Sequence, residues 1–143
     1  MTLLDANILI YAYNEATPKH HAAKEWIADL FSDEGWVGIP WVTIWAFLRI
    51  TTNPRAMQSP FSTQQALEIV NTWITLPNVI LVEPGVRHIE ILESMVTKGQ
   101  ASGPLLTDAV LAALATEQGA VFASTDHDFS RFPGLSWINP LQD

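Results

Sequence analysis

The sequence predicts an α/β fold, a three-layer α/β/α sandwich with a central, mainly parallel sheet. Two observations favour this fold class. Short apolar segments alternate along the chain with longer segments of helical character. The short segments are apolar at consecutive positions, so both faces of each strand are expected to be buried. A parallel sheet covered by helices on both faces provides that burial.

The expected elements alternate in chain order. Strands are expected at residues 2–4, 36–39, 79–82, 120–123 and 135–138, with the last at an edge of the sheet. Helices are expected at residues 19–31, 41–51, 63–76, 86–98 and 105–118. Residues 7–13 (NILIYAY) form either a short helix or a continuation of the first strand.

Proline marks the helix boundaries in the first half of the chain. Thr17 and Pro18 supply an N-cap and a first helical residue for the segment KHHAAKEWIADLF. Pro40 opens the apolar segment WVTIWAFLRIT, which is long enough for a helix. Asn53 and Pro54 end that helix, because the residue before a proline avoids the helical conformation.

Capping residues mark the helices of the second half. Ser62 and Gln65 have the spacing of a capping box at the start of TQQALEIVNTWITL. Pro84 and Gly85 precede the helix VRHIEILESMVTK, which ends at Gly99. A glycine follows the helix LLTDAVLAALATEQ and marks its end before the fourth strand.

Composition limits the classes of protein that fit. The 143 residues predict one domain spanning 1–143, and 48% hydrophobic with 15% charged residues is typical of a globular chain. No membrane-spanning run, basic leader or cysteine is present, which makes a cytoplasmic protein the simplest expectation. The net charge of −8 favours a basic partner or a bound cation over nucleic acid.

Four aspartates follow or precede strands in a pattern that suggests one site. Asp5 ends the first strand, Asp126 and Asp128 follow the fourth, and Asp108 lies in the first turn of the helix before it. Ligands of open α/β sheets bind at the carboxyl edge of the strands. Each acid alone has an ordinary explanation: a turn or N-cap for Asp5, the helix dipole for Asp108, an Asx-turn for the other two.

If these acids converge, they need a cation or a proton. Two carboxylates ~5 Å apart repel by about 3 kcal/mol at an effective dielectric of 20. Three such pairs would approach the entire stability of a domain, about 5–15 kcal/mol. Oxygen ligands without cysteine suit Mg²⁺ or Mn²⁺ better than zinc.

The sequence resembles the PIN domains at these positions. LLDANILIYA, LLTDAVLAALA and STDHDFSRFPG are similar to the acidic motifs of that family. WVTIWAFLRITTNP and FPGLSWINPL are similar to segments of its VapC toxins, in particular the mycobacterial-type branch. The resemblance covers nearly the whole chain, and the order and spacing of the motifs carry it.

The resemblance implies a function and a set of site residues. VapC toxins are Mg²⁺- or Mn²⁺-dependent endoribonucleases that cleave structured cellular RNA, often tRNA or rRNA. A cognate VapB-type antitoxin blocks them, and homodimers are usual. By motif, Asp5, Asp108 and Asp126 match the metal ligands and Asp128 a further catalytic acid. Two small polar residues match accessory positions beside those acids, namely Asn7 and Thr107.

One position departs from the family pattern. Many PIN domains carry a Glu three residues before an Arg in the central helix; here the Arg matches Arg49 and the Glu position holds Ala46. The departure removes either a ligand to a second metal or a water-mediated contact, unless an acid elsewhere replaces it. The conceivable replacements are Glu15, Glu25 and Glu83. The departure supports an alternative function, a catalytically weakened PIN domain that binds RNA or an antitoxin without cutting.

The remaining charged and aromatic residues give weaker expectations. Arg49 is the best candidate for an RNA contact, because a charge in an apolar helix needs a reason. Further phosphate-contact candidates are Lys19, Lys24, Arg55 and Arg131. Core packing is expected for Trp41, Trp45 and Trp73, whereas Trp26 and Trp36 fit an interface equally well. A phosphate-accepting receiver domain is disfavoured. Such a domain needs a paired acid after the first strand and a lysine after a late strand, and this sequence has neither.

Overall fold

The computed structural model describes residues 1–142 and contains a five-stranded sheet in the order β3-β2-β1-β4-β5. Every pair of neighbouring strands is parallel, and β5 lies at an edge as expected. The strands are β1 (Thr2–Leu4), β2 (Val37–Pro40), β3 (Val79–Val82), β4 (Val121–Ala123) and β5 (Trp137–Ile138).

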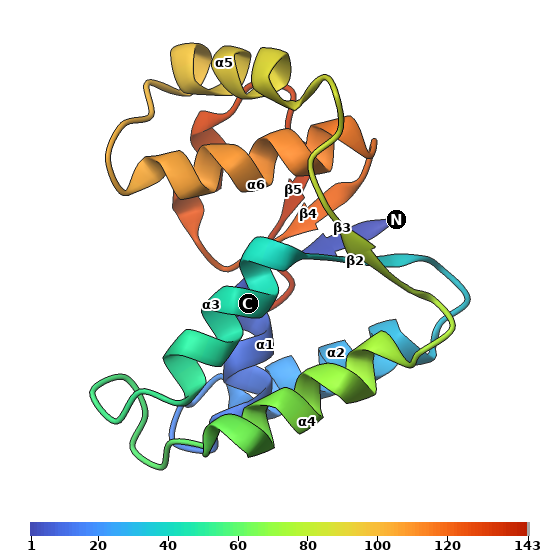
Figure 1. Cartoon of the computed structure of the whole chain (residues 1–143), viewed down its shortest axis with the longest axis vertical. Coiled ribbons are helices and arrows are strands. Elements are labelled where there is room, and N and C mark those ends of the chain that lie inside the picture. Colours follow the sequence, from blue (N-terminus) through green and yellow to red (C-terminus); the bar gives the residue numbers. More distant parts are fainter. Residues whose placement is uncertain (143) are drawn as a thin grey trace.

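Helices cover both faces of the sheet, which confirms the three-layer α/β/α prediction. Figure 1 shows α5 and α6 on one side of the sheet and α1 to α4 on the other. The helices are α1 (Ala6–Tyr13), α2 (His20–Ser32), α3 (Trp41–Thr51), α4 (Thr63–Ile74), α5 (His88–Gly99), α6 (Leu105–Glu117) and the short 3₁₀ helix η1 (His127–Arg131). Residues 7–13 are thus helical. No helix within residues 1–142 has the length and apolarity that a bilayer crossing requires.

Two apolar clusters fill the space between the layers. One lies under α1 to α4 and contains Phe47 and Trp73, whose ring centroids are 4.7 Å apart in an edge-on arrangement. The other lies under α5 and α6 and contains Phe122 and Phe129. Consecutive residues of β1 belong to different clusters, because side chains alternate across the sheet: Leu3 faces α6 and Leu4 faces α1.

Side-chain contacts explain where two helices begin. In α4 the Ser62 hydroxyl accepts from the Gln65 amide at 3.1 Å and the Gln65 side chain accepts from the Ser62 amide at 2.9 Å, which confirms the capping box. Helix α5 begins at His88, two residues later than expected. The Glu117 carboxylate accepts from the Gly85 amide at 2.9 Å and contacts His88 Nδ1 at 2.6 Å, so it holds a turn over residues 85–88 before the helix begins.

The glycine that ends α5 is needed for close packing. A Cβ on Gly99 would lie 2.6 Å from the ring of Phe132, well inside van der Waals contact. The left-handed backbone conformation at this helix end belongs to the next residue, Gln100, with φ 51°. The glycine therefore brings η1 close to α5 and does not itself supply the turn.

The burial of the tryptophan side chains differs in part from the prediction. Trp73 is buried, and Trp41 is half-buried against the same core cluster. The prediction of core packing is wrong for Trp45, which is 60% exposed. The face of α3 that meets the core carries Thr43, Ile44, Phe47 and Thr51. Helical periodicity places Trp45 on the opposite face from these residues. Trp36 is 54% exposed before β2, and Trp26 is half-buried.

Candidate metal centre

The sequence-predicted acids come from three elements that meet at the carboxyl edge of the sheet. Asp5 follows the last residue of β1, and its amide donates to the Ala123 carbonyl at the end of β4. Asp126 is the N-cap of η1, three residues after β4. Asp108 lies in the first turn of α6. Because β1 and β4 are parallel neighbours, their ends bring these segments together.

Three carboxylates form the centre of the site. Oxygen atoms of Asp108, Asp126 and Asp128 all lie within 4.8 Å of one another. Asp126 Oδ1 accepts from the Asp128 amide at 2.9 Å, an Asx-turn geometry that aims both side chains to the same side of η1. Asp108 and Asp126 are half-buried and Asp128 is exposed, so the cluster opens to solvent at Asp128.

Asp5 is held beside this cluster by hydrogen bonds. Its Oδ1 accepts from the Ala6 amide at 2.7 Å and thereby caps α1. Its Oδ2 accepts from the Ser124 hydroxyl at 2.6 Å. Both oxygens keep a free lone pair, so these contacts orient the carboxylate and leave it able to bind a cation.

A fully buried serine connects the acids and was missed by sequence reasoning. The Ser124 hydroxyl donates to Asp5 and accepts from Asn7 Nδ2 at 3.1 Å and from the Asp126 amide at 3.0 Å. One donor and two lone pairs are all that a hydroxyl offers, so its capacity is used completely. The only sequence signal was its place as the first residue after β4, in the quoted segment STDHDF.

Burial and repulsion between the acids make two carboxylates of the site harder to ionise. Burial, and then repulsion by Asp126, Asp5 and Asp128, raises the pKa of Asp108 to about 6, against a smaller opposing effect of Arg131. Burial also raises the pKa of Asp5, with hydrogen bonds from Ser124 and Ala6 opposing it and repulsion by Asp126 adding to it.

One of the two predicted accessory residues belongs to the site, and the other lies on the surface. Asn7 joins the network through Ser124 and lies 3.5 Å from the Thr125 amide. Thr107 is exposed, and its side chain makes no hydrogen bond with residues 1–142. Arg131 Nη1 donates to the Gly99 carbonyl at 3.0 Å, so this cation ties η1 to the end of α5.

The central helix brings no carboxylate to the site. Ala46 is half-buried against the core cluster, and α3 contains no acidic residue. The conceivable replacements Glu15, Glu25 and Glu83 are all exposed. Within residues 1–142, the acidic cluster contains none of them. Arg49 is exposed in the last turn of α3.

The donor set decides which ligand fits. Three clustered carboxylates with a fourth beside them offer only hard oxygen ligands, and their repulsion favours a small divalent cation. The site can therefore hold an ion of this kind while Ser124 and the α1 N-terminus fix the orientation of Asp5.

Ser124→Ala is expected to weaken divalent-cation binding by about 10- to 100-fold, because the partners that orient first-shell carboxylates contribute that much. Asn7 and the Asp126 amide would lose their acceptor, at a cost of about 1–3 kcal/mol in the free energy of unfolding. Calorimetric titration with Mn²⁺ and urea denaturation measure the two effects. Ser32→Ala, which removes an exposed serine hydroxyl, is the matched control. Unchanged Mn²⁺ affinity in Ser124→Ala would show that the network does not support the site.

Comparisons with known proteins give the family. The sequence matches the PIN domain over residues 2–135. It is 38% identical to ribonuclease VapC37 of Mycobacterium tuberculosis over 98% of this chain and 97% of that protein. It is 35% identical to ribonuclease VapC33 of the same species over the full length of both.

The fold is also shared with solved structures. VapBC2 from Rickettsia felis, solved with a promoter DNA fragment, matches with a TM-score of 0.66 at 17% identity, covering 96% of this chain and 97% of that one. VapC20 of Mycobacterium tuberculosis, described as a Sarcin-Ricin loop cleaving toxin, matches with a TM-score of 0.65 at 18% identity, covering 91% and 93%. Sequence and fold agree with the acidic edge described above, and the chain belongs to the PIN domain family.

Proposed function

We propose that this chain is the toxin of a type II toxin–antitoxin pair, a metal-dependent endoribonuclease that cleaves structured cellular RNA in the cytoplasm. The observation that carries the proposal is the cluster of Asp108, Asp126 and Asp128 at the carboxyl edge of a PIN fold. Full-length similarity to proteins named ribonucleases supports the same activity.

The bound ion is proposed to be Mg²⁺ or Mn²⁺. Asp5, Asp108 and Asp126 would hold it, and Asp128 would be a further acid beside it. The raised pKa values of Asp5 and Asp108 support this assignment, because burial and repulsion by neighbouring acids raise them and a bound cation would relieve that repulsion. When bound, such an ion supplies positive charge that promotes ionisation of water and offsets charge on a phosphodiester.

The other residues of the site would have separate roles in binding and cleavage. Asp128 is the exposed member of the cluster, so it is placed to orient an attacking water from the solvent side. Ser124 would keep Asp5 in place, and Asn7 would in turn hold Ser124, so that Asp5 does not rearrange when the charge at the site changes. Arg49 is proposed to contact an RNA phosphate. A charge of −8 would otherwise repel RNA, so positively charged contacts of this kind have to outweigh it.

The proposed protein partner is a cognate VapB-type antitoxin with a basic segment. A guanidinium inserted among the carboxylates would satisfy their charge in place of the ion, through charge-assisted hydrogen bonds. Expression of the chain alone should arrest bacterial growth, and co-expression of the antitoxin should restore it. Growth that is unaffected by the expressed and folded chain would argue against a toxin.

Cleavage of end-labelled tRNA and rRNA by the purified chain is expected with Mg²⁺ or Mn²⁺ and not with excess EDTA. Because the cation binds the folded state, it should also raise the free energy of unfolding by about 2.7 kcal/mol at 100 times its Kd, and the melting temperature should rise with it. Calorimetry and gel electrophoresis measure the two effects. Cleavage that persists in EDTA would contradict the metal-dependent mechanism.

Ala46 favours a second candidate, a PIN domain that binds RNA or antitoxin without cutting it. The missing carboxylate on α3 leaves the site with fewer ligands than many PIN domains have. A metal titration separates the two functions. A nuclease gives products that increase with cation concentration, whereas a pure binding module gives none at any concentration.

A further inference from the structure

Charge is distributed unevenly along this acidic chain. Of its 15 acidic residues, none falls within residues 35–67, although Glu34 and Glu68 flank that stretch directly. Arg49 and Arg55 are the charged residues of this segment. Neither arginine forms an ion pair with any residue in 1–142. The segment 35–67, which contains α3, therefore carries a net positive charge in a protein of net charge −8.

The exposed face of α3 adds an aromatic surface to this charge. Trp41, Trp45 and Arg49 follow one another at intervals of four residues, so they lie on one side of the helix. Trp45 is 60% exposed, and its ring centroid lies 6.3 Å from that of Trp41 with an interplanar angle of 33°. Trp41 packs against the core, so the outer ring rests on a fixed one.

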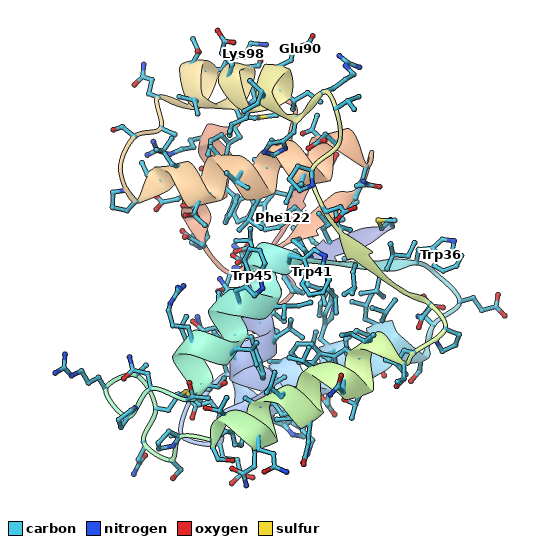
Figure 2. All side chains as sticks on the ribbon, in the orientation of Figure 1. Trp36, Trp41, Trp45, Glu90, Lys98 and Phe122 are labelled. Carbon is cyan, nitrogen blue, oxygen red and sulfur yellow. The ribbon has the colours of Figure 1, made fainter. Side chains whose placement is uncertain are left out.

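The N-terminal end of α3, where Trp41 is the first residue, lies near the acidic site. Helix α3 begins directly after β2, at the same edge of the sheet where Asp5 follows β1. In its first turn, Thr43 Oγ1 donates to the carbonyl of Leu4 at 2.8 Å, one residue before Asp5. Figure 2 shows Trp41 and Trp45 side by side at the end of α3 that meets the sheet.

We propose that the α3 face formed by Trp41, Trp45 and Arg49 binds an unpaired stretch of the RNA substrate. Trp45 would stack on a base and Arg49 would contact the phosphate next to it. The proposal rests on the proposed ribonuclease function. It adds that the α3 face recognises a nucleotide of the substrate that is free to unstack. A Trp face accepts any base, and an adjacent arginine follows the backbone, which is how single-stranded nucleic acid is commonly bound.

Charge favours RNA over a second copy of this chain as the occupant. A two-fold interface would place the face against itself, and the residues that form it include no acid to pair with Arg49 of the second copy. Trp45 is also the single large apolar side chain of α3 that is exposed, whereas a stable interface needs about 800 Å² from each partner. RNA phosphates complement the same charge directly.

Binding of a fluorescein-labelled, unstructured RNA of about ten nucleotides tests the proposal. The full chain is titrated in EDTA, so that binding is measured without metal-dependent cleavage. Trp45→Leu should weaken binding by roughly 5- to 150-fold, the usual effect of losing one base–aromatic stack, and Trp45→Phe should restore most of it. Arg49→Gln should reduce the slope of log affinity against log salt by about one.

Trp36→Ala is the matched control, because Trp36 is 54% exposed in the same acid-free segment but precedes β2 at the opposite edge of the sheet. Figure 2 shows it well away from Trp45. Its binding and cleavage should equal those of the wild type. Melting curves exclude unfolding of the variants.

In cleavage assays Trp45→Leu should raise KM by a factor similar to its loss of RNA affinity, with kcat unchanged, since stacking contributes equally to bound substrate and transition state.

Three results would overturn the proposal: no binding by the wild type, equal binding by Trp45→Leu and wild type, or conversion of a dimer to a monomer by Trp45→Leu with RNA affinity per chain unchanged. The last, seen by sedimentation, would identify the face as a self-interface. A wild type that binds through Trp45 but cuts no RNA with Mg²⁺ would instead reject the ribonuclease function and keep the binding face.

Discussion

Asp108→Asn is expected to lower the rate of RNA cleavage at least about 100-fold while raising the melting temperature of the metal-free protein by about 3 °C. Loss of a residue that only orients a ligand costs about 10- to 100-fold, so loss of a carboxylate from the cluster itself should cost more. The Asp108 side chain makes no hydrogen bond with residues 1–142, so the amide replaces it without leaving a partner unsatisfied. Activity and stability should therefore move in opposite directions.

The stability gain follows from the pKa of Asp108. It rises from 3.8 to about 6 on folding, so between about pH 4 and pH 6 the folded state binds more protons than the unfolded state. The free energy of unfolding then falls as pH rises through this window and stays lower above it. With allowance for solvent screening at a partly exposed group, the loss is about 1 kcal/mol, or about 3 °C for a chain of this size. Asparagine cannot ionise, so the variant lacks this loss.

Thermal melts in EDTA at a series of pH values measure the effect, together with cleavage assays in Mg²⁺. Asp29→Asn is the matched control, because it also removes one negative charge but from an exposed position on α2. It should leave both cleavage and the pH dependence unchanged. A variant at Asp108 that cuts RNA at the wild-type rate would remove this residue from the site, and one that melts lower than the wild type would contradict the repulsion argument.

Much of the fold could be predicted because its signals are local. Consecutive apolar residues identified each strand, and the capping box at Ser62 placed the start of α4 correctly. The errors came from contacts between distant segments. Helix α5 starts late because Glu117, on another helix, holds the preceding turn. Trp45 was expected inside because apolar residues surround it in sequence, but the core contacts of α3 fall on its other face.

The candidate site could also be predicted from the sequence only in part. Asp108, Asp126 and Asp128 could be proposed from their positions relative to strands, and the structure brings their oxygens within 4.8 Å of one another. Ser124 could not be found in this way. Its partner Asp5 is 119 residues away, and a serine after a strand is common in turns. Only the pairing of β1 with β4 brings the two together and gives the hydroxyl its role.

Trp73→Ala is expected to lower the free energy of unfolding by about 3–5 kcal/mol, the range for removing a large aromatic side chain from a core. Trp73 is 2% exposed and packs edge-on against Phe47. Its Nε1 also donates to the Tyr13 hydroxyl at 3.2 Å, so the truncation leaves a cavity and takes a hydrogen-bond partner from Tyr13. For a chain of this length the melting temperature should fall by roughly 10–15 °C.

The same variant should keep its activity while it is folded. Trp73 belongs to the cluster under α1 to α4, whereas α6 and η1, which carry three of the acids, pack in the cluster on the other side of the sheet. Urea denaturation and cleavage at low temperature test the two statements, with Trp73→Phe expected to recover most of the stability because it refills the space between Phe47 and Tyr13. A large loss of cleavage in a fully folded Trp73→Ala protein would mean that the two clusters are coupled through the sheet, and that the acids depend on packing well beyond Ser124.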